Sequence, residues 1–157
     1  MNILITGGSG FLGKQLNAAL KDKKNKIVSL SSKSLDMRKR ENFKKLNKTK
    51  FNKIFHLAAW TQAGDFCLTN PGLQWLNNQL INTNLLDWWK NFQPQAKLIS
   101  IGTSCAYPMG RNLKEKDYIS GVPKEELLAY AMSKKMLHVG KKSLSKQFSL
   151  NYLTIVS

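Results

Sequence analysis

The 157-residue chain lacks any apolar run long enough to cross a membrane, and it has only two cysteines, Cys67 and Cys105. A transmembrane helix needs about 20 consecutive apolar residues. Two cysteines at this separation form neither a zinc-ligand spacing nor a disulfide framework. The N-terminal MNILIT leads directly into a glycine loop, unlike a secretion signal. We therefore expect a soluble, cytoplasmic protein without a metal site.

Acidic residues are also scarce. Nine Asp and Glu stand against 25 Lys and Arg, so the formal net charge is +16. Only three of the basic residues are arginine, the residue that usually recognises phosphates or bases in bidentate fashion. The lysines are spread along the chain, which predicts that most of them lie on solvated faces. This pattern disfavours nucleic acid as the partner.

Five short apolar runs alternate with helical patterns. The expected strands are 2–6, 26–30, 53–57, 97–101 and 151–156. The expected helices are 11–23, 71–92 and 125–147, with a weaker helix at 38–48. Strict alternation indicates a parallel sheet with helices on both faces. Because there are no repeats or linkers, we predict one α/β domain over residues 1–157, a Rossmann-type doubly wound sheet with strand order 3-2-1-4-5.

The stretch TGGSGFLGKQL follows the first expected strand. Gly8, Gly10 and Gly13 satisfy G-x-G-x-x-G, and Gly7 with the last two satisfies the related G-x-x-G-x-x-G. Such a turn receives a pyrophosphate on its backbone amides and on the N-terminus of the following helix. Its position between a strand and a helix is the context that supports a dinucleotide site.

The residues closing the second strand bear on the choice of cofactor. A carboxylate there would bind the ribose hydroxyls of NAD. The chain instead has Ser32 and Lys33, with no carboxylate before Asp36. Hydroxyls and a cation suit a 2′-phosphate, so NADP is favoured and NAD stays possible.

YAMSK places Tyr130 and Lys134 at i and i+4 of an expected helix. Both side chains can then approach a common point. An ammonium group near a phenol favours the phenolate, which suits proton transfer. An isolated Y-x-x-x-K is more often a surface pair, so the other motifs decide its meaning.

Five motifs occur in a fixed order: GGSGFLG (7–13), FHLAA (55–59), Asn78 with NTNLL (82–86), TSCAYP (103–108) and YAMSK (130–134). In this order they resemble the extended short-chain dehydrogenase/reductase family, the NAD(P)-dependent sugar epimerases and dehydratases. TSCAYP is similar to the branch that epimerises and reduces GDP-4-keto-6-deoxy-mannose. A nucleotide sugar is thus the implied substrate.

The resemblance implies a role for each motif. Tyr130 would transfer the proton at the sugar oxygen. Lys134 would bind the nicotinamide ribose and lower the pKa of the tyrosine, and Thr103 would hold the substrate oxygen. The implied cofactor contacts are Gly7, Gly10, Phe11, Leu12, Gly13, Ser32, Lys33, Asp36, Leu57, Ala58, Ala59, Asn78, Tyr130 and Lys134.

Two interpretations of Cys105 stay open. A free cysteine is commonly a small buried hydrophobe. In the branch that TSCAYP resembles, the matching cysteine exchanges protons beside the sugar ketone, a role that suits a thiol whose pKa is lowered by a nearby cation.

Members of the family are about twice as long as this chain, so we expect the cofactor half with its substrate domain missing. The chain would then be a homo-oligomer or be completed by another chain. Other reactions of the family stay open, namely sugar 4-epimerisation, dehydration or 4-keto-rhamnose reduction, which SLDMRK (34–39) favours. An inactive cofactor-binding module is a further alternative.

Overall fold

The computed structural model describes residues 1–21, 24–62, 64–110 and 114–156. Five parallel strands form one sheet in the order β2-β1-β3-β4-β5. The strands are β1 (Asn2–Thr6), β2 (Lys26–Leu30), β3 (Lys53–His56), β4 (Lys97–Ile101) and β5 (Tyr152–Ile155). The α-helices are α1 (Phe11–Lys21), α2 (Phe66–Thr69), α3 (Pro71–Phe92) and α4 (Leu128–Phe148). Short 3-10 helices are η1 (Arg40–Leu46), η2 (Ser104–Ala106), η3 (Glu115–Asp117) and η4 (Glu125–Leu127).

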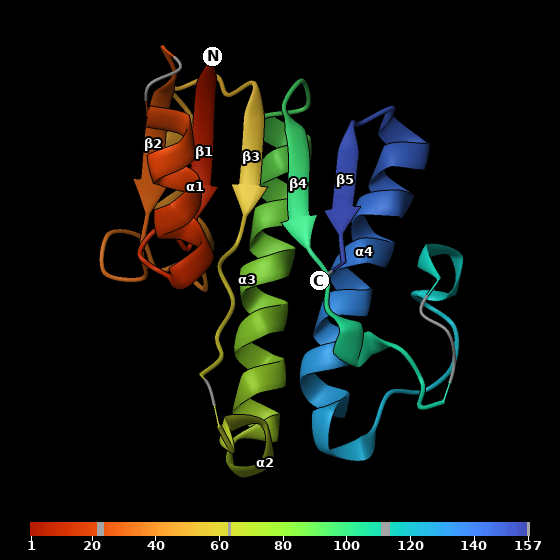
Figure 1. Ribbon diagram of the computed structural model, residues 1–157. Coiled ribbons are helices and arrows are strands. Elements are labelled where there is room, and N and C mark those ends of the chain that lie inside the picture. Colours follow the sequence, from red (N-terminus) through yellow and green to blue (C-terminus); the bar gives the residue numbers. More distant parts are fainter. Residues whose placement is uncertain (22–23, 63, 111–113, 157) are drawn as a thin grey trace.

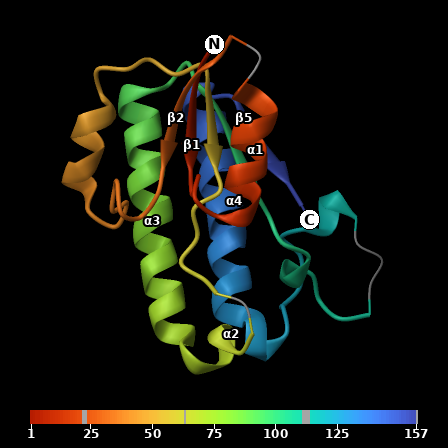
Figure 2. The same ribbon diagram turned by 60° about the vertical axis from the view of Figure 1, so that its left-hand side comes forward.

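Helices cover both faces of the sheet. In Figure 1, α1 crosses in front of β1 and β2, while α3 and α4 lie behind the sheet. Figure 2 shows α1 on one side of the strands and α3 with α4 on the other. Helix α1 contacts β1 and β2, and α3 packs against α4. The predicted Rossmann-type α/β class is therefore confirmed.

The main core lies between the sheet and α3. Leu4, Ile54 and Leu98, one from each central strand, are completely buried. Helix α3 contributes Trp88 and Trp89, which are 2% and 0% exposed. Their indole N–H groups donate to Asn47 Oδ1 and Ala96 O, both at 2.9 Å, so neither indole donor is left unpaired. Helix α3 is thus held firmly against the strands whose ends form the site.

The predicted strand order, 3-2-1-4-5, is wrong. β3 pairs with β1 on the side away from β2, so β2 is an edge strand. The predicted order places the strand 53–57 outside β2, but the chain beyond β2 forms turns at 32–34 and 37–38 and the 3-10 helix η1 before it returns to β1 as β3. The backbone turns at Asp36, whose carboxylate accepts from the N–H of Arg38 at 3.1 Å. Such a turn competes with strand pairing.

The helices differ from the predictions at three places. The weak helix expected at 38–48 is the 3-10 helix η1. The helix expected at 125–147 begins with the 3-10 turn η4 and continues as α4. The short helix α2 had no counterpart among the predictions. Helix α1 ends at Lys21, and the last two residues of the expected helix 11–23 lie outside the described residues. Within the described ranges, no helix has both the length and the hydropathy needed to span a bilayer.

Candidate active site

The glycine loop joins β1 to α1 and packs directly on the segment after β3. Gly7 has φ +72°, and a Cβ there would lie 2.7 Å from the backbone nitrogen of Ala58. A Cβ at Gly13 would collide with backbone atoms of Gly7 and Gly8. At Gly10 it would meet only Gly7 O, at 3.3 Å. Glycine is therefore required at 7 and 13 for close packing, whereas the space beside Gly10 belongs to an adjoining cavity.

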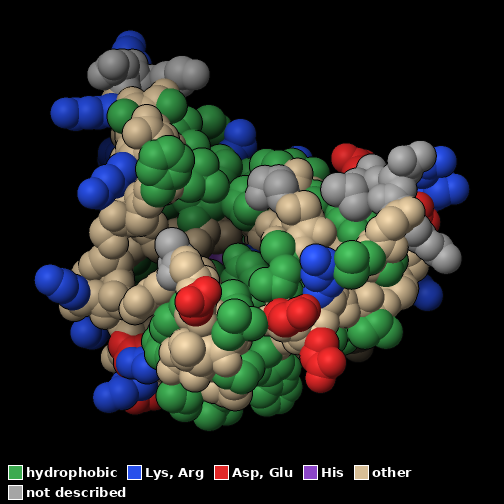
Figure 3. All heavy atoms as spheres, turned by 60° about the horizontal axis from the view of Figure 1, so that its bottom comes forward, with side chains coloured by type: hydrophobic (Ala, Val, Ile, Leu, Met, Phe, Trp, Pro, Cys, Tyr) green, Lys and Arg blue, Asp and Glu red, His purple; other side chains and the backbone are tan. Residues whose placement is uncertain are grey.

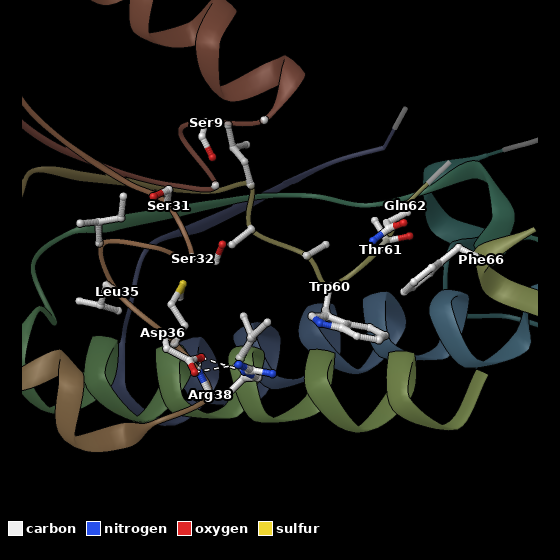
Figure 4. A pocket seen from close by; sticks show the side chains of 18 residues that line it. Ser9, Ser31, Ser32, Leu35, Asp36, Arg38, Trp60, Thr61, Gln62 and Phe66 are labelled. Carbon is white, nitrogen blue, oxygen red and sulfur yellow. Dashed lines mark hydrogen bonds and ion pairs between the residues drawn. The ribbon is translucent and has the colours of Figure 1, made fainter. Parts of the chain in front are cut away.

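This cavity of about 480 Å³ opens at the carboxyl ends of the first three strands. Seven of the predicted cofactor residues line it: Gly7, Gly10, Ser32, Asp36, Leu57, Ala58 and Ala59. Figure 4 shows Asp36 and Arg38 toward one end and Trp60 with Phe66 toward the other. The ring centroids of Trp60 and Phe66 lie 4.9 Å apart. The arrangement is an elongated site with a charged end and an aromatic end, at the sheet edge where α/β folds bind ligands.

Arg38 is the basic side chain that faces this cavity, and the sequence analysis missed it. Its guanidinium donates twice to Asp36, from Nε at 2.9 Å and from Nη2 at 2.8 Å, and once to Asn77 Oδ1 at 3.2 Å. The hydrogen bond from Arg38 holds the pKa of Asp36 below its usual range. The signal that could have found it is the rarity of arginine in this chain. Lys33, in contrast, lies in the exposed turn 32–34 and does not line the cavity.

The other predicted cofactor residues lie around the cavity instead of lining it. Phe11 and Leu12 open α1 with exposed side chains, so only their backbone amides could serve a phosphate. Asn78 is buried, and its side-chain amide bonds both backbone groups of Trp60, at 2.9 and 3.0 Å. Asn78 therefore positions the cavity wall through Trp60.

Tyr130 and Lys134 lie on one face of α4, as the spacing predicts. The ammonium nitrogen of Lys134 is 5.7 Å from the centroid of the Tyr130 ring. Lys134 is 7% exposed, and burial lowers its pKa to about 8. The pKa of Tyr130 is raised, by burial first and then by Cys105 and Cys67. Burial is the largest cause of this shift, and the expectation that Lys134 lowers the tyrosine's pKa stays a prediction.

Thr103 and Cys105 follow β4 and reach the same region. Thr103 is buried and caps η2, where its hydroxyl accepts from the N–H of Cys105 at 3.3 Å. The turn η2 packs against α4, and the influence of Cys105 on the pKa of Tyr130 shows that the two side chains are close. The structure thus places the turn that holds Thr103 and Cys105 against helix α4, which carries Tyr130 and Lys134.

Cys67 connects this cluster to the cavity. It follows Phe66, which lines the aromatic end, and it also raises the pKa of Tyr130. Tyr130 therefore lies near the aromatic end. Gln74, fully buried behind Cys67, donates to its sulfur at 3.5 Å and to Thr61 Oγ1 at 3.0 Å. His56 is buried between Thr6 and Asn82, and burial lowers its pKa to about 3, so it is a neutral packing residue.

A glycine-loop cavity at the carboxyl ends of the strands, with a tyrosine–lysine pair on helix α4, is typical of a dinucleotide-binding α/β domain. The chain belongs to the NAD dependent epimerase/dehydratase family, which matches residues 3–156. This confirms the resemblance that the ordered motifs carried.

Two curated relatives and one solved structure illustrate the match. GDP-L-colitose synthase of Yersinia pseudotuberculosis is 32% identical over 129 residues, which is 82% of this chain and 39% of that protein. GDP-L-fucose synthase of Dictyostelium discoideum is 27% identical over 161 residues, 98% of this chain and 50% of that protein. A crystal structure of a GDP-L-fucose synthetase from Naegleria fowleri bound to NADP superposes with a TM-score of 0.82 at 29% identity, covering 99% of this chain and 52% of that one. The chain therefore spans between 39% and 52% of the length of these relatives.

Proposed function

We propose that this chain carries the NADP-binding and proton-transferring half of an epimerase/reductase acting on a GDP-4-keto-6-deoxy sugar. The observation that carries the proposal is the cavity that runs from the glycine loop to the end near Tyr130. Further support comes from the relatives, whose names contain GDP-linked sugars, and from NADP in the structure of one of them.

The residues present fit NADP. Open space beside Gly10 and the first-turn amides of α1 would receive the pyrophosphate. The adenosine end of the cofactor would face Ser31, Ser32 and Arg38. The hydroxyls of the two serines and the guanidinium of the arginine match a 2′-phosphate. Trp60 and Phe66 would flank the nicotinamide end. The bound cofactor would supply a hydride to the sugar carbon.

The chain's own residues would handle the substrate oxygen and its proton. A raised pKa keeps the Tyr130 phenol protonated at neutral pH, so it would donate its proton to the ketone oxygen as that oxygen becomes a hydroxyl. Thr103 would hold the same oxygen by a hydrogen bond. Lys134, with a pKa of about 8, stays mostly cationic at neutral pH and would stabilise the phenolate left behind. Cys105 would exchange the proton on the carbon beside the ketone during epimerisation.

Titration with NADPH tests the first half of the proposal. The 1–157 polypeptide should bind NADPH saturably, and the absence of any saturable binding would refute the cofactor assignment. A second arm follows NADPH consumption with GDP-4-keto-6-deoxy-mannose. Because the relatives are about twice as long, we expect weak binding and no turnover from residues 1–157 alone, and turnover from the full-length protein. Binding without turnover in the full-length protein would favour the alternative of an inactive cofactor module.

A further inference from the structure

Helix α4 buries a second lysine, Lys141, away from the cavity. It is completely buried, and its ammonium group donates to oxygens on the neighbouring strands β4 and β5. Its partners are Ser100 Oγ on β4, Leu153 O on β5 at 2.9 Å and Thr154 Oγ1 on β5 at 2.7 Å. Since Ser100 and Thr154 are register partners, one amine bridges the β4–β5 pair.

No carboxylate balances this buried charge among the described residues. The ion pairs in the part of the chain that the structure describes join Arg38 to Asp36 and Arg40 to Asp87, away from this amine. The titratable groups that face Lys141 are Lys134 and His138 on α4, His56 on β3, and Tyr152 on β5, whose ring centroid is 5.4 Å from the ammonium nitrogen. None of them is a carboxylate. Burial, and then the charge of Lys134, lower the pKa of Lys141 to about 7.

The hydrogen bonds around Lys141 can be made in either protonation state. A hydroxyl both donates and accepts, and a neutral amine donates two hydrogen bonds and accepts one. Ser100 or Thr154 can therefore donate to the neutral amine while Leu153 O continues to accept. His138 Nδ1 lies 2.9 Å from Thr154 Oγ1 and continues the network. Deprotonation thus removes the buried charge without leaving a polar group unpaired, and the charged state carries the desolvation cost.

We propose that Lys141 makes the docking of β5 proton-dependent: a neutral amine keeps β5 closed on β4 and α4, and protonation favours a local opening that lets water reach the ammonium group. Strand β5 is one of the two outer strands of the sheet and pairs with β4 alone, so it can open while the remaining strands stay paired.

The sign of the effect follows from proton binding. The pKa of Lys141 is about 7 in the closed state, against 10.5 for a solvated lysine. Between these values the open state binds one more proton, so the closed state gains stability as pH rises from 7 toward 10.5. Below pH 7 both states are charged, and this group adds no further pH dependence.

Amide hydrogen exchange tests the proposal directly. The N–H of Gly102 donates to Ile155 O across the β4–β5 pair, whereas the N–H of Gly8 donates to Leu30 O beside β2. After correction for intrinsic exchange, protection of Gly102 should rise about tenfold per pH unit above pH 7, while protection of Gly8 should not follow it. Lys141→Met should flatten the Gly102 profile, and the exposed control Lys142→Met should leave it unchanged.

Three outcomes would overturn the proposal. The pH dependence of Gly102 protection could be unchanged in Lys141→Met, it could be the same at Gly8, or it could be absent from the wild-type protein. A measurement on the wild-type protein covers the case in which Lys141→Met fails to fold. The side-chain 13Cε resonance of Lys141 should titrate near pH 7, and a midpoint near that of a solvated lysine would contradict the mechanism.

Discussion

At the scale of single residues, the proposed reduction depends on the proton of Tyr130. Burial raises the pKa of this phenol, so it is protonated at neutral pH and ready to donate. Lys134 stays mostly charged at neutral pH because its lowered pKa is still about 8. A protonated phenol beside an ammonium group suits the reductive direction, in which an oxygen that gains negative charge must take up a proton.

Replacement of Tyr130 by Phe tests this assignment. The variant keeps the ring that packs on Lys134 and loses the transferable proton. We expect the turnover rate of the full-length protein to fall by roughly two or more orders of magnitude. NADPH consumption measures the rate, and circular dichroism checks the fold. Tyr152→Phe, on β5 and away from the cavity lining, is the matched control. A near-normal rate in Tyr130→Phe would remove the tyrosine from the mechanism.

Arg38 is expected to set the preference for NADPH over NADH. It lines the charged end of the cavity, and a hydrogen bond to a charged partner contributes about 1.5–3 kcal/mol. Arg38→Met should therefore reduce the ratio of NADPH to NADH affinity by about tenfold or more. The ratio is measured by titrating each nucleotide.

Lys33→Met is the variant to compare with Arg38→Met in the nucleotide titrations. The sequence alone predicts that replacing Lys33 narrows the gap between the affinities for NADPH and NADH, whereas the exposed turn that holds Lys33 points to a smaller effect than that of Arg38. A larger loss of preference in Lys33→Met than in Arg38→Met would restore the original assignment. Equal affinities of the wild-type protein for the two nucleotides would refute the NADP preference altogether.

The sequence predicts the position of a functional residue when that position depends on near neighbours in the chain. Tyr130 and Lys134 share a helix, so their spacing fixes their common face. The position of Arg38 could not be predicted in the same way, because the direction of its side chain depends on the turn at Asp36 and on a hydrogen bond to Asn77 of α3. The role of Asn78 depends likewise on the path of the chain near Trp60.

At the scale of secondary structure, the sequence predicts where the strands lie, but it does not predict which strands pair with each other. Each strand is a short run of apolar residues, and such a run can be recognised in the sequence as a buried strand. The order of strands depends on the connection from β2 to β3, which passes over α3 as turns and the 3-10 helix η1. Asn84 of α3 donates to the carbonyls of Met37 and Arg38 and fixes this path. Such contacts, distant in sequence, have no local signature.

The glycine loop gives the sharpest test at this scale. Gly7→Ala places a Cβ 2.7 Å from the backbone of Ala58 at a positive φ, where L-residues are strained. We expect a loss of more than about 1 kcal/mol in the free energy of unfolding, measured by urea denaturation. Gly72→Ala on α3, where an added Cβ meets nothing within 4 Å, should instead be neutral or stabilise by up to about 1 kcal/mol. Equal effects of the two substitutions would contradict the close packing of the loop.

At the scale of the whole molecule, basic and apolar side chains are largely separated on one face (Figure 3). Figure 3 views the molecule from the carboxyl ends of the strands and shows hydrophobic side chains across the centre, with most Lys and Arg side chains toward the margins. The outer strand β5 adds an apolar surface of its own. Tyr152 and Thr154 face α4, while Leu153 and Ile155 are 42% and 45% exposed on the other side.

An outer strand with exposed apolar side chains can pair with or pack on another chain. We therefore expect the 1–157 polypeptide to self-associate through β5, so that its apparent mass rises with concentration in light scattering. Leu153→Lys should reduce this association, because a charged side chain on an outer strand disfavours docking. Leu73→Lys, at a 55% exposed leucine of α3, should not. If Leu73→Lys abolishes the association and Leu153→Lys does not, the contact lies on α3, and a polypeptide that stays monomeric at every concentration would exclude both surfaces.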